Sequence, residues 1–169
     1  PISFDDFVDQ NISFGSRQHS LEEFLRSNTW SRPRDIVQLL NSISFKSPNA
    51  ERIGEKEIKS ALNEFARRSF YEIMDEISVR HGSTIGVTLR NNIKKQRFGT
   101  FDEFNRAVLL KFVGVNREQL LNDLFHSGVI GNWNRGEGRY YWAHKGEEFF
   151  DQTMGVTIHE GLWNYFNIR

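Results

Sequence analysis

Cysteine is absent from this sequence of 169 residues. The absence excludes disulfides, thiolate zinc sites, iron–sulfur clusters and a cysteine nucleophile, and it fits a reducing compartment. No apolar run approaches the roughly 20 residues that a membrane-spanning helix needs. The first residues, Pro1 to Asp6, are neither basic nor apolar enough for a signal peptide. We therefore expect a cytoplasmic protein that makes no membrane contact.

An excess of either charge is also missing, because Lys plus Arg and Asp plus Glu both number 22. Attraction to nucleic acid or to an acidic membrane surface would therefore need a local patch. Hydrophobic residues make up 38% of the chain and aromatic residues 14%, which is enough apolar material for a folded core. The length allows one or two domains.

Known catalytic motifs are missing as well. The sequence has no Gly-x-x-x-x-Gly-Lys-Ser/Thr phosphate loop, no Rossmann glycine fingerprint, no His-Glu-x-x-His helix and no nucleophile elbow. Its five histidines are far apart, so we expect them at the surface or at helix caps and not on a metal ion. We predict no catalytic residue, no metal site and no cofactor within this chain, and hence no enzyme on its own.

The first part of the sequence predicts a helical, lid-like domain over residues 1–82. Apolar spacing predicts a short helix within residues 2–14, and the capping box Ser20-Leu21-Glu22-Glu23 begins a helix to about Ser27. Pro33 suits the first turn of a helix that ends near Phe45, before a turn at residues 47–49. The strongest helical pattern follows and ends at His81-Gly82, which gives a long helix that links two lobes.

The second part predicts a winged helix over residues 83–169. Helices are expected over residues 83–96, after a second capping box at Thr100-Phe101-Asp102-Glu103, and after the cap Asn116. Residues 129–133 and 139–143 flank a glycine-rich turn and predict a hairpin, with a further strand at 155–159 and a short helix at 160–166. Three helices followed by a hairpin is the order of a winged helix. The predicted fold is mainly α with a small β component, in which a helical lid-like bundle is joined by the long helix to a C-terminal winged helix.

A stretch without acidic residues, from Arg80 to Thr100, is the first candidate for a binding surface. Basic side chains there and on the wing could contact a nucleic-acid backbone. Together with polar residues of the expected recognition helix they form the candidate nucleic-acid-binding set: Arg90, Lys94, Lys95, Arg97, Arg117, Asn122, Arg135 and Arg139.

Two observations leave the partner of the winged helix open. The expected recognition helix, residues 116–126, has mixed charge, whereas DNA readers usually present positive or amide groups there. Winged helices also dock proteins, so DNA and protein both remain candidate partners. Aromatic residues of the hairpin could stack on bases, but alternation along the strands places half of them in the core: Trp133, Tyr140, Tyr141 and Trp142.

The run Arg32-Pro33-Arg34-Asp35 is the second candidate site. An arginine at a helix start is well placed to reach a phosphate, because its planar fork offers two parallel donors. The alternative is that these arginines pair with local acids such as Asp35 or Glu22. The residues alone leave both interpretations open.

The sequence from Phe24 to Asn41, which contains Thr29-Trp30-Ser31-Arg32-Pro33-Arg34-Asp35, resembles the helix found after the nucleotide-binding core in a family of bacterial P-loop ATPases related to the AAA+ and STAND classes. Residues 58–76 resemble that family's helix leading out of the lid. Residues 124–131 and 158–163 resemble its terminal winged helix. The resemblance covers residue 20 to the end of the chain.

The resemblance implies that the chain is the C-terminal part of such an ATPase, or a free-standing relative, because a start at Pro1 fits both removal of Met and a cut from a longer chain. Arg34 or Arg32 would then sense the terminal phosphate of ATP, and the long helix would carry the resulting motion to the winged helix. Some members of this wider class act in phage defence or regulation. Walker motifs are absent here, so ATP and Mg²⁺ are implied only with an upstream nucleotide-binding core.

Three functions are therefore carried forward. The first is a non-catalytic regulatory module that couples the nucleotide state of a P-loop ATPase to a DNA or protein partner. The second is a free-standing winged-helix DNA-binding regulator whose N-terminal helices form a dimer interface. The third is a protein-interaction adaptor.

Overall fold

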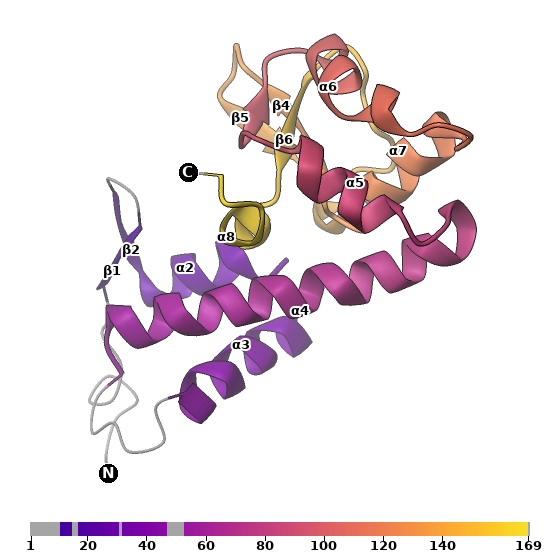
Figure 1. The fold of residues 1–169 in the computed structure, drawn as a ribbon. Helices are drawn as coiled ribbons and strands as arrows, with labels where there is room; N and C mark the ends of the chain where they lie inside the picture. Colours follow the sequence, from indigo (N-terminus) through magenta and orange to yellow (C-terminus); the bar gives the residue numbers. More distant parts are fainter. Residues whose placement is uncertain (1–10, 15–16, 31, 47–52, 169) are drawn as a thin grey trace. The chain divides into compact units, whose positions relative to one another are not determined.

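The computed structural model describes residues 11–14, 17–30, 32–46 and 53–168. The chain divides into two compact units, unit 1 (Pro1–Arg68) and unit 2 (Ser69–Arg169), and the division falls within one long helix (Figure 1). The fold is mainly α with a small β component, as predicted. The predicted domain boundary at residue 82 lies at the end of that helix, about four turns after the division between the units.

Unit 1 begins with a two-stranded antiparallel hairpin among its described residues. Strand β1 (Asn11–Phe14) pairs with β2 (Arg17–Ser20), with Asn11 opposite Ser20 and Phe14 opposite Arg17. The helix predicted within residues 2–14 is therefore wrong for residues 11–14, and residues 1–10 lie outside the described part. The apolar spacing used for that prediction is local, whereas the pairing with β2 satisfies the backbone of β1 from outside the segment.

The helices of unit 1 begin where the sequence indicates. Helix α2 (Leu21–Asn28) has a complete capping box, in which Glu23 N donates to Ser20 Oγ at 3.2 Å and Ser20 N donates to Glu23 Oε2 at 3.1 Å. Helix α3 (Pro33–Lys46) starts at the predicted proline. Helix α4 (Glu55–His81) is the predicted long helix. The turn predicted at residues 47–49 lies outside the described residues.

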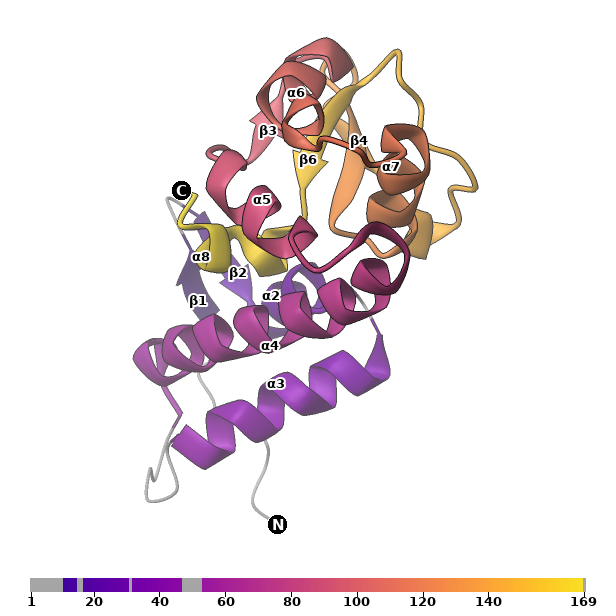
Figure 2. The same ribbon diagram turned by 45° about the vertical axis from the view of Figure 1, so that its right-hand side comes forward.

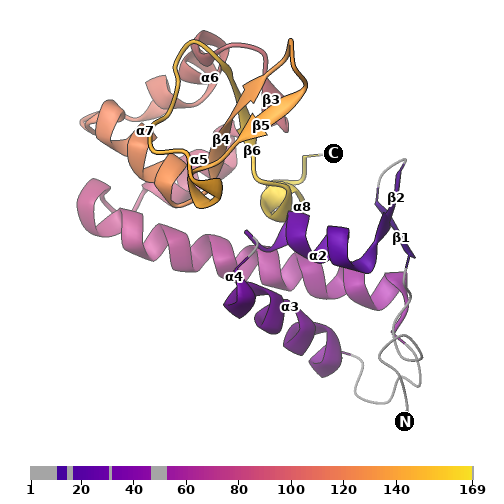
Figure 3. The ribbon, with the colours of Figure 1, turned by 180° about the vertical axis from the view of Figure 1, so that it is seen from behind.

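The core of unit 1 lies between α2, α3 and the first part of α4. Apolar side chains of all three helices are buried, and the Trp30 and Phe65 rings are 6.4 Å apart. At the edge of this core, Lys46 Nζ lies 3.1 Å from Glu64 Oε2, and the hydrogen bond from Lys46 lowers the pKa of the Glu64 carboxyl. In Figures 1 and 3, α2 and α3 run along different sides of this part of α4.

Unit 2 has the element order of a winged helix. After α4 come α5 (Ile85–Asn92), β3 (Arg97–Phe98), α6 (Phe101–Ala107), the short 3-10 helix η1 (Leu109–Lys111) and α7 (Arg117–His126). The remaining elements are β4 (Ile130–Asn134), β5 (Arg139–Tyr141), η2 (Ala143–Lys145), β6 (Gly155–Ile158), η3 (Glu160–Leu162) and α8 (Trp163–Phe166). Figure 2 shows α5, α6 and α7 arranged around the sheet.

The predicted hairpin exists, but it is not the centre of the sheet. In the described part of unit 2 the strand order is β3-β6-β4-β5, all antiparallel. The late strand β6 therefore lies between β3 and β4, and β5 is an edge strand on the far side of β4. The sequence pattern predicted β6 only as a further strand after the hairpin. Its central position depends on pairing with two strands distant in sequence, which no local pattern reports.

Helix α5 ends earlier than predicted, at Asn92 instead of Gln96. The next residues leave the helix because the sheet uses their backbone. The carbonyl oxygen of Gln96 accepts from Ile158 N at 2.8 Å, directly before β3 begins. The sequence after Asn92 allows either a helix or a strand, and pairing with β6 favours the strand.

The sheet has one core face and one outer face. Phe98, Ile130, Val156 and Ile158 are buried on the core face, where the Phe98 and Phe104 rings meet edge to face at 5.2 Å. By register, the other face, called the outer face below, carries Arg97, Thr157, Gly155, Trp133 and Tyr140. Thr157 and Gly155 of β6 are buried there, whereas Arg97 and Tyr140 are exposed. This division sets which side chains of the sheet can meet a partner.

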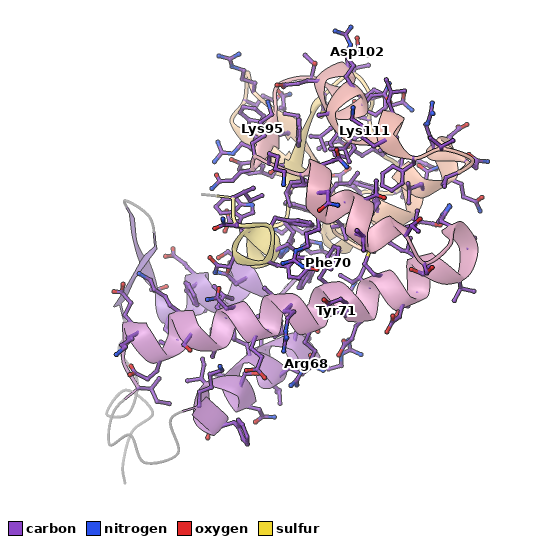
Figure 4. The ribbon with its side chains drawn as sticks, viewed as in Figure 1. Arg68, Phe70, Tyr71, Lys95, Asp102 and Lys111 are labelled. Carbon is purple, nitrogen blue, oxygen red and sulfur yellow. The ribbon has the colours of Figure 1, made fainter. Side chains whose placement is uncertain are left out.

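The second part of α4 belongs to the core of unit 2. Phe70 stacks on Tyr165 with ring centroids 4.4 Å apart and meets Phe166 edge to face at 5.2 Å. Met74 packs beside Gly86 of α5, where an added Cβ would approach Met74 Cγ to 3.2 Å. Figure 4 shows the Phe70 side chain directed toward α8. These contacts explain why unit 2 begins before the end of the helix.

Candidate nucleic-acid interface

Arg97 lies over two aromatic rings on the outer face of the sheet. Its Cζ is 5.5 Å from the Trp133 ring centroid and 5.5 Å from the Tyr140 ring centroid. Both distances are within the range of cation–π attraction. Trp133 on β4 and Tyr140 on β5 are directly opposite in register, so the two rings share one face. We call Arg97, Trp133 and Tyr140 the cation–aromatic surface.

Gly155 on β6 lies between the two parts of this surface. Gly155 pairs with Trp133 of β4, and the next residue, Val156, pairs with Phe98 of β3. A Cβ at position 155 would lie 2.6 Å from the carbonyl oxygen of Phe98 and 3.1 Å from that of Trp133. Because strand β6 has no side chain here, the Arg97 side chain from β3 can extend toward rings on β4 and β5.

Lys95 adds a second positive charge next to β3. Its ammonium is 4.9 Å from the Phe98 ring centroid and pairs with Glu103 Oε1 of α6. Glu103 Oε2 also accepts from Gly99 N at 2.7 Å, while Thr100 Oγ1 accepts from Glu103 N at 3.2 Å. The hydrogen bonds from Lys95 and from Gly99 N lower the pKa of the Glu103 carboxyl. The predicted second capping box is therefore half correct: the Thr100 cap forms, but the glutamate binds Gly99 and Lys95.

The tip of the β4–β5 hairpin carries two further arginines. Asn134 Oδ1 accepts from Gly136 N at 3.0 Å and from Glu137 N at 3.3 Å, which fixes the turn between Arg135 and Arg139. Both arginines are exposed. Glu137 accepts the Tyr141 hydroxyl at 2.8 Å, and this bond raises the pKa of the phenol. The wing thus presents two positive charges around one negative charge.

Arg90 and Lys94 lie near the end of α5 and form a separate group. Arg90 Cζ lies 5.3 Å from the Tyr165 ring centroid, and Lys94 Nζ donates to the Arg90 carbonyl oxygen at 3.5 Å. Both side chains are exposed. Arg90 therefore covers the aromatic contacts between α4 and α8 and makes no contact of this kind with Trp133 or Tyr140.

Helix α7 uses its charged side chains for contacts within unit 2. Arg117 Nε donates to the Phe112 carbonyl oxygen at 3.3 Å. Asp123 accepts from Arg80 NH1 at 3.0 and 3.2 Å, and its Oδ2 lies 2.7 Å from Nε2 of His81, a ring that is 2% exposed. Asn122 is exposed. The recognition-helix position therefore holds the end of α4 in place and presents no array of positive side chains.

The structure brings together only part of the predicted nucleic-acid-binding set. Arg97 and Lys95 lie at β3, and Arg135 and Arg139 lie on the hairpin whose rings Arg97 contacts. Arg117 and Asn122 lie on α7, which Figures 1 and 3 place on the opposite side of unit 2 from the hairpin. Figure 4 shows Lys95 on the strand side of the unit, whereas Asp102 and Lys111 lie at α6 and the segment after it.

The hairpin aromatics differ in exposure, but not by simple alternation, because Tyr140 and Trp142 are two residues apart and lie on the same face of the sheet. Trp142 is 6% exposed and covers Gly131, where a Cβ would meet its ring at 2.6 Å. Tyr140 is 39% exposed, and Trp133 and Tyr141 are half-buried. Sequence pattern did not indicate that Arg97 would reach Trp133 and Tyr140, because the contact crosses β6.

Two histidines differ from the expectation of surface positions. His81 is buried beside Asp123, and His159 is 3% exposed. His159 does act as a cap, since its Nδ1 accepts from Gly161 N at 3.1 Å. Neither belongs to a metal cluster: within the described ranges, no group of three or more His, Cys, Asp or Glu residues could hold a metal ion.

Arg32 and Arg34 lie at the start of α3 in unit 1. Both are exposed, and Arg34 Nε is 3.6 Å from Oδ1 of Asp35, a residue that is 5% exposed. The local pairing of Arg34 with Asp35 that the sequence allows is therefore present. Pro33 fills the first helical position, where its missing N–H costs no hydrogen bond.

No helix in the described part of the chain combines the length and apolar character needed to cross a membrane. Residues 3–74 match the family model of the FunZ-associated C-terminal helical domain. The match covers unit 1 and the first residues of unit 2 and ends before the elements of the winged helix. No curated protein and no solved structure matches the chain. By this comparison, residues 3–74 are similar to a helical domain that is described as C-terminal and FunZ-associated.

Proposed function

We propose that this chain is a non-catalytic binding module whose unit 2 holds nucleic acid through the cation–aromatic surface and the neighbouring basic side chains. The observation that carries the proposal is the position of Arg97, exposed on the outer face and within 5.5 Å of two aromatic rings. The rings restrict the arginine without removing its charge, so less side-chain entropy is lost when it binds a phosphate.

The neighbouring charges support the same conclusion. Lys95 and Arg97 are on or next to β3, and Arg135 is in the turn of the hairpin that provides the rings. Arg139 is on the same hairpin but, by register, on the face opposite Tyr140. The nearby acids are Glu103, which pairs with Lys95, and Glu137, which accepts the Tyr141 hydroxyl. Since phosphate contacts supply most of the sequence-independent affinity, this local positive excess fits a backbone-binding surface. The balanced charge of the whole chain is compatible with this proposal, because the binding depends on a local patch.

The test is fluorescence anisotropy with labelled mixed-sequence oligonucleotides at low salt. Arg97→Ala should weaken binding about ten-fold, equal to about 1.4 kcal/mol, and should reduce the salt slope by about one phosphate contact. Arg106→Ala is the matched control, because Arg106 is an exposed arginine of unit 2 on α6, paired only loosely with Asp102 at 3.9 Å. Absence of binding at low salt, or equal losses in both variants, would contradict the proposal and favour a protein-docking adaptor.

A second candidate function is coupling to the nucleotide state of a P-loop ATPase. The exposed Arg32 and Arg34 at the start of α3, and the match of residues 3–74 to a helical domain, support it. In that case Arg32 or Arg34 would contact the terminal phosphate of ATP on a separate core, and ATP with Mg²⁺ would bind that core and not this chain. Arg34 would have to exchange its contact with Asp35 for the phosphate.

The gene that encodes the chain provides the test of this second candidate. A Gly-x-x-x-x-Gly-Lys-Ser/Thr loop upstream in the same reading frame would support it, and the whole protein should then lose nucleotide-dependent changes when Arg32 or Arg34 is replaced by Ala. A reading frame without such a loop would contradict it. ATP turnover by this chain alone would contradict both proposals, because each assigns the chain no catalysis.

A further inference from the structure

We propose that the cation–aromatic surface is specific for single-stranded nucleic acid, with bases stacking on the Tyr140–Trp133 pair. The inference rests on the proposed function, since it names the form of nucleic acid that the same surface takes. It follows from three features: the exposure of the rings, the position of the arginine and the internal use of charges on α7.

The rings lie on a face that a flexible strand can approach. Tyr140 is 39% exposed, and its neighbour Trp133 is directly opposite on the paired strand. Residues directly opposite in an antiparallel pair have Cβ atoms about 5 Å apart, so the two side chains are neighbours on one face. In a duplex the faces of the bases are covered by their neighbours, whereas unpaired bases can stack on protein aromatics.

Arg97 supplies the backbone contact at the same place. Its Cζ is 5.5 Å from each of the two ring centroids, and Gly155 leaves β6 without a side chain next to it. A guanidinium beside aromatic rings can donate to a phosphate and also stack on a base. The rings that can stack on a base and the arginine that can bind a phosphate are therefore close enough to contact the same nucleotide. Single-strand binding grooves combine these two kinds of contact.

The alternative, insertion of α7 into the major groove of a duplex, is disfavoured by the mixed charge of this helix. Arg117 donates to a backbone carbonyl and Asp123 holds Arg80 and His81. Glu118 is negative, and the exposed Gln119 and Asn122 are the amide groups that α7 could offer to bases. Readers of duplex DNA present arginine, lysine or amide groups at this position, and a free carboxylate would face phosphate repulsion.

The experiment compares a labelled single strand with the duplex of the same sequence, by anisotropy, using the full chain. We expect the single strand to bind at least about ten-fold more tightly. Tyr140→Leu, which keeps an apolar side chain on β5, should weaken single-strand binding about ten-fold and duplex binding clearly less, while Tyr140→Phe should retain the wild-type affinity. Phe149→Ala is the control, because Phe149 is an aromatic residue of unit 2 that is 81% exposed and lies outside this surface.

Trp133 provides a second measurement that does not depend on the Tyr140 variants folding well. A stacked base should quench tryptophan fluorescence in the wild type, and Trp133→Phe should remove that part of the quenching while Trp30, Trp142 and Trp163 remain. Equal or tighter duplex binding, or equal losses for both forms in Tyr140→Leu, overturns the single-strand inference but leaves nucleic-acid binding intact. No binding of either form overturns both.

Discussion

Helix α7 and the outer face of the sheet both belong to unit 2, and their charged side chains have different neighbours. On α7, Arg117 donates to a backbone carbonyl and Asp123 fixes the buried His81 and the exposed Arg80. On the outer face, Arg97 is exposed and its guanidinium lies over the Trp133 and Tyr140 rings. A hydrogen-bonded charge stabilises the unit, whereas a charge held by rings keeps its donors available to a ligand.

This difference teaches that position in a winged helix does not by itself identify the binding element. We propose that the helix in the recognition position acts as scaffold and that the strands supply the binding surface. The four predictions that follow test that contrast, beginning with the largest expected effect.

Leu124→Ala should lower the free energy of unfolding of the chain by about 2–5 kcal/mol, because a fully buried leucine of α7 is replaced by a cavity. Urea unfolding followed by circular dichroism measures the change. Asn122→Ala, at an exposed position of the same helix, is the control and should change the free energy by less than about 0.5 kcal/mol. Equal effects of the two variants would contradict the assignment of α7 as scaffold.

Asp123→Asn should lower the free energy of unfolding by about 1–3 kcal/mol, because it replaces the charged partner of the buried His81 and of Arg80. Glu118→Gln removes a carboxylate from an exposed position of the same helix and should have little effect. The same urea experiment distinguishes them. If Asp123→Asn instead tightened nucleic-acid binding without loss of stability, α7 would be part of the interface and the contrast would fail.

Arg117→Ala should change nucleic-acid affinity by less than about two-fold, in contrast to the roughly ten-fold loss expected for Arg97→Ala. Both substitutions remove one arginine from unit 2, so they have the same effect on net charge and differ only in location. Anisotropy at a single low salt concentration gives the comparison. A larger loss for Arg117→Ala would move the interface from the sheet to α7.

Acidification should weaken the attachment of α6 to the segment before it, and this is the smallest effect expected. The pKa of Glu103 is lowered in the folded chain, chiefly by the hydrogen bond from Lys95, so its contribution is complete above the unfolded pKa and is lost as pH falls through the lowered folded value. Glu103→Gln should therefore reduce the decline of thermal stability below about pH 4.5. Glu118→Gln is the control, and an unchanged pH profile in Glu103→Gln would contradict the assignment.

Local sequence signals predicted most of the helices because the deciding interactions are local. Ser20 and Glu23 close a capping box within one turn, Pro33 begins α3, and Asn116 caps α7 through Gln119 N at 3.1 Å. The hairpin was predictable for the same reason, since Asn134 and the glycines that follow define its turn. Signals of this kind act over three or four residues and need no knowledge of the rest of the fold.

Predictions failed where distant backbone segments compete for hydrogen bonds. Residues 93–96 leave the helix because Gln96 bonds to β6, and residues 11–14 pair with β2 instead of forming a helix. The position of β6 between β3 and β4 also depends on hydrogen bonds to segments distant in sequence. For the candidate site, the basic residues were visible in the sequence, but their division between the sheet and α7 was not.

By itself, the sequence determined the helix starts, the hairpin, the mainly α composition and the set of basic residues from which an interface can be formed. Only the tertiary structure decided which of those residues act together. Arg97 reaches Trp133 and Tyr140 because β6 places a glycine between them, and the exposed Arg117 donates from Nε to the Phe112 carbonyl oxygen. Such contacts join segments separated by a strand or a loop, and their energies depend on distances in space that residue spacing does not encode.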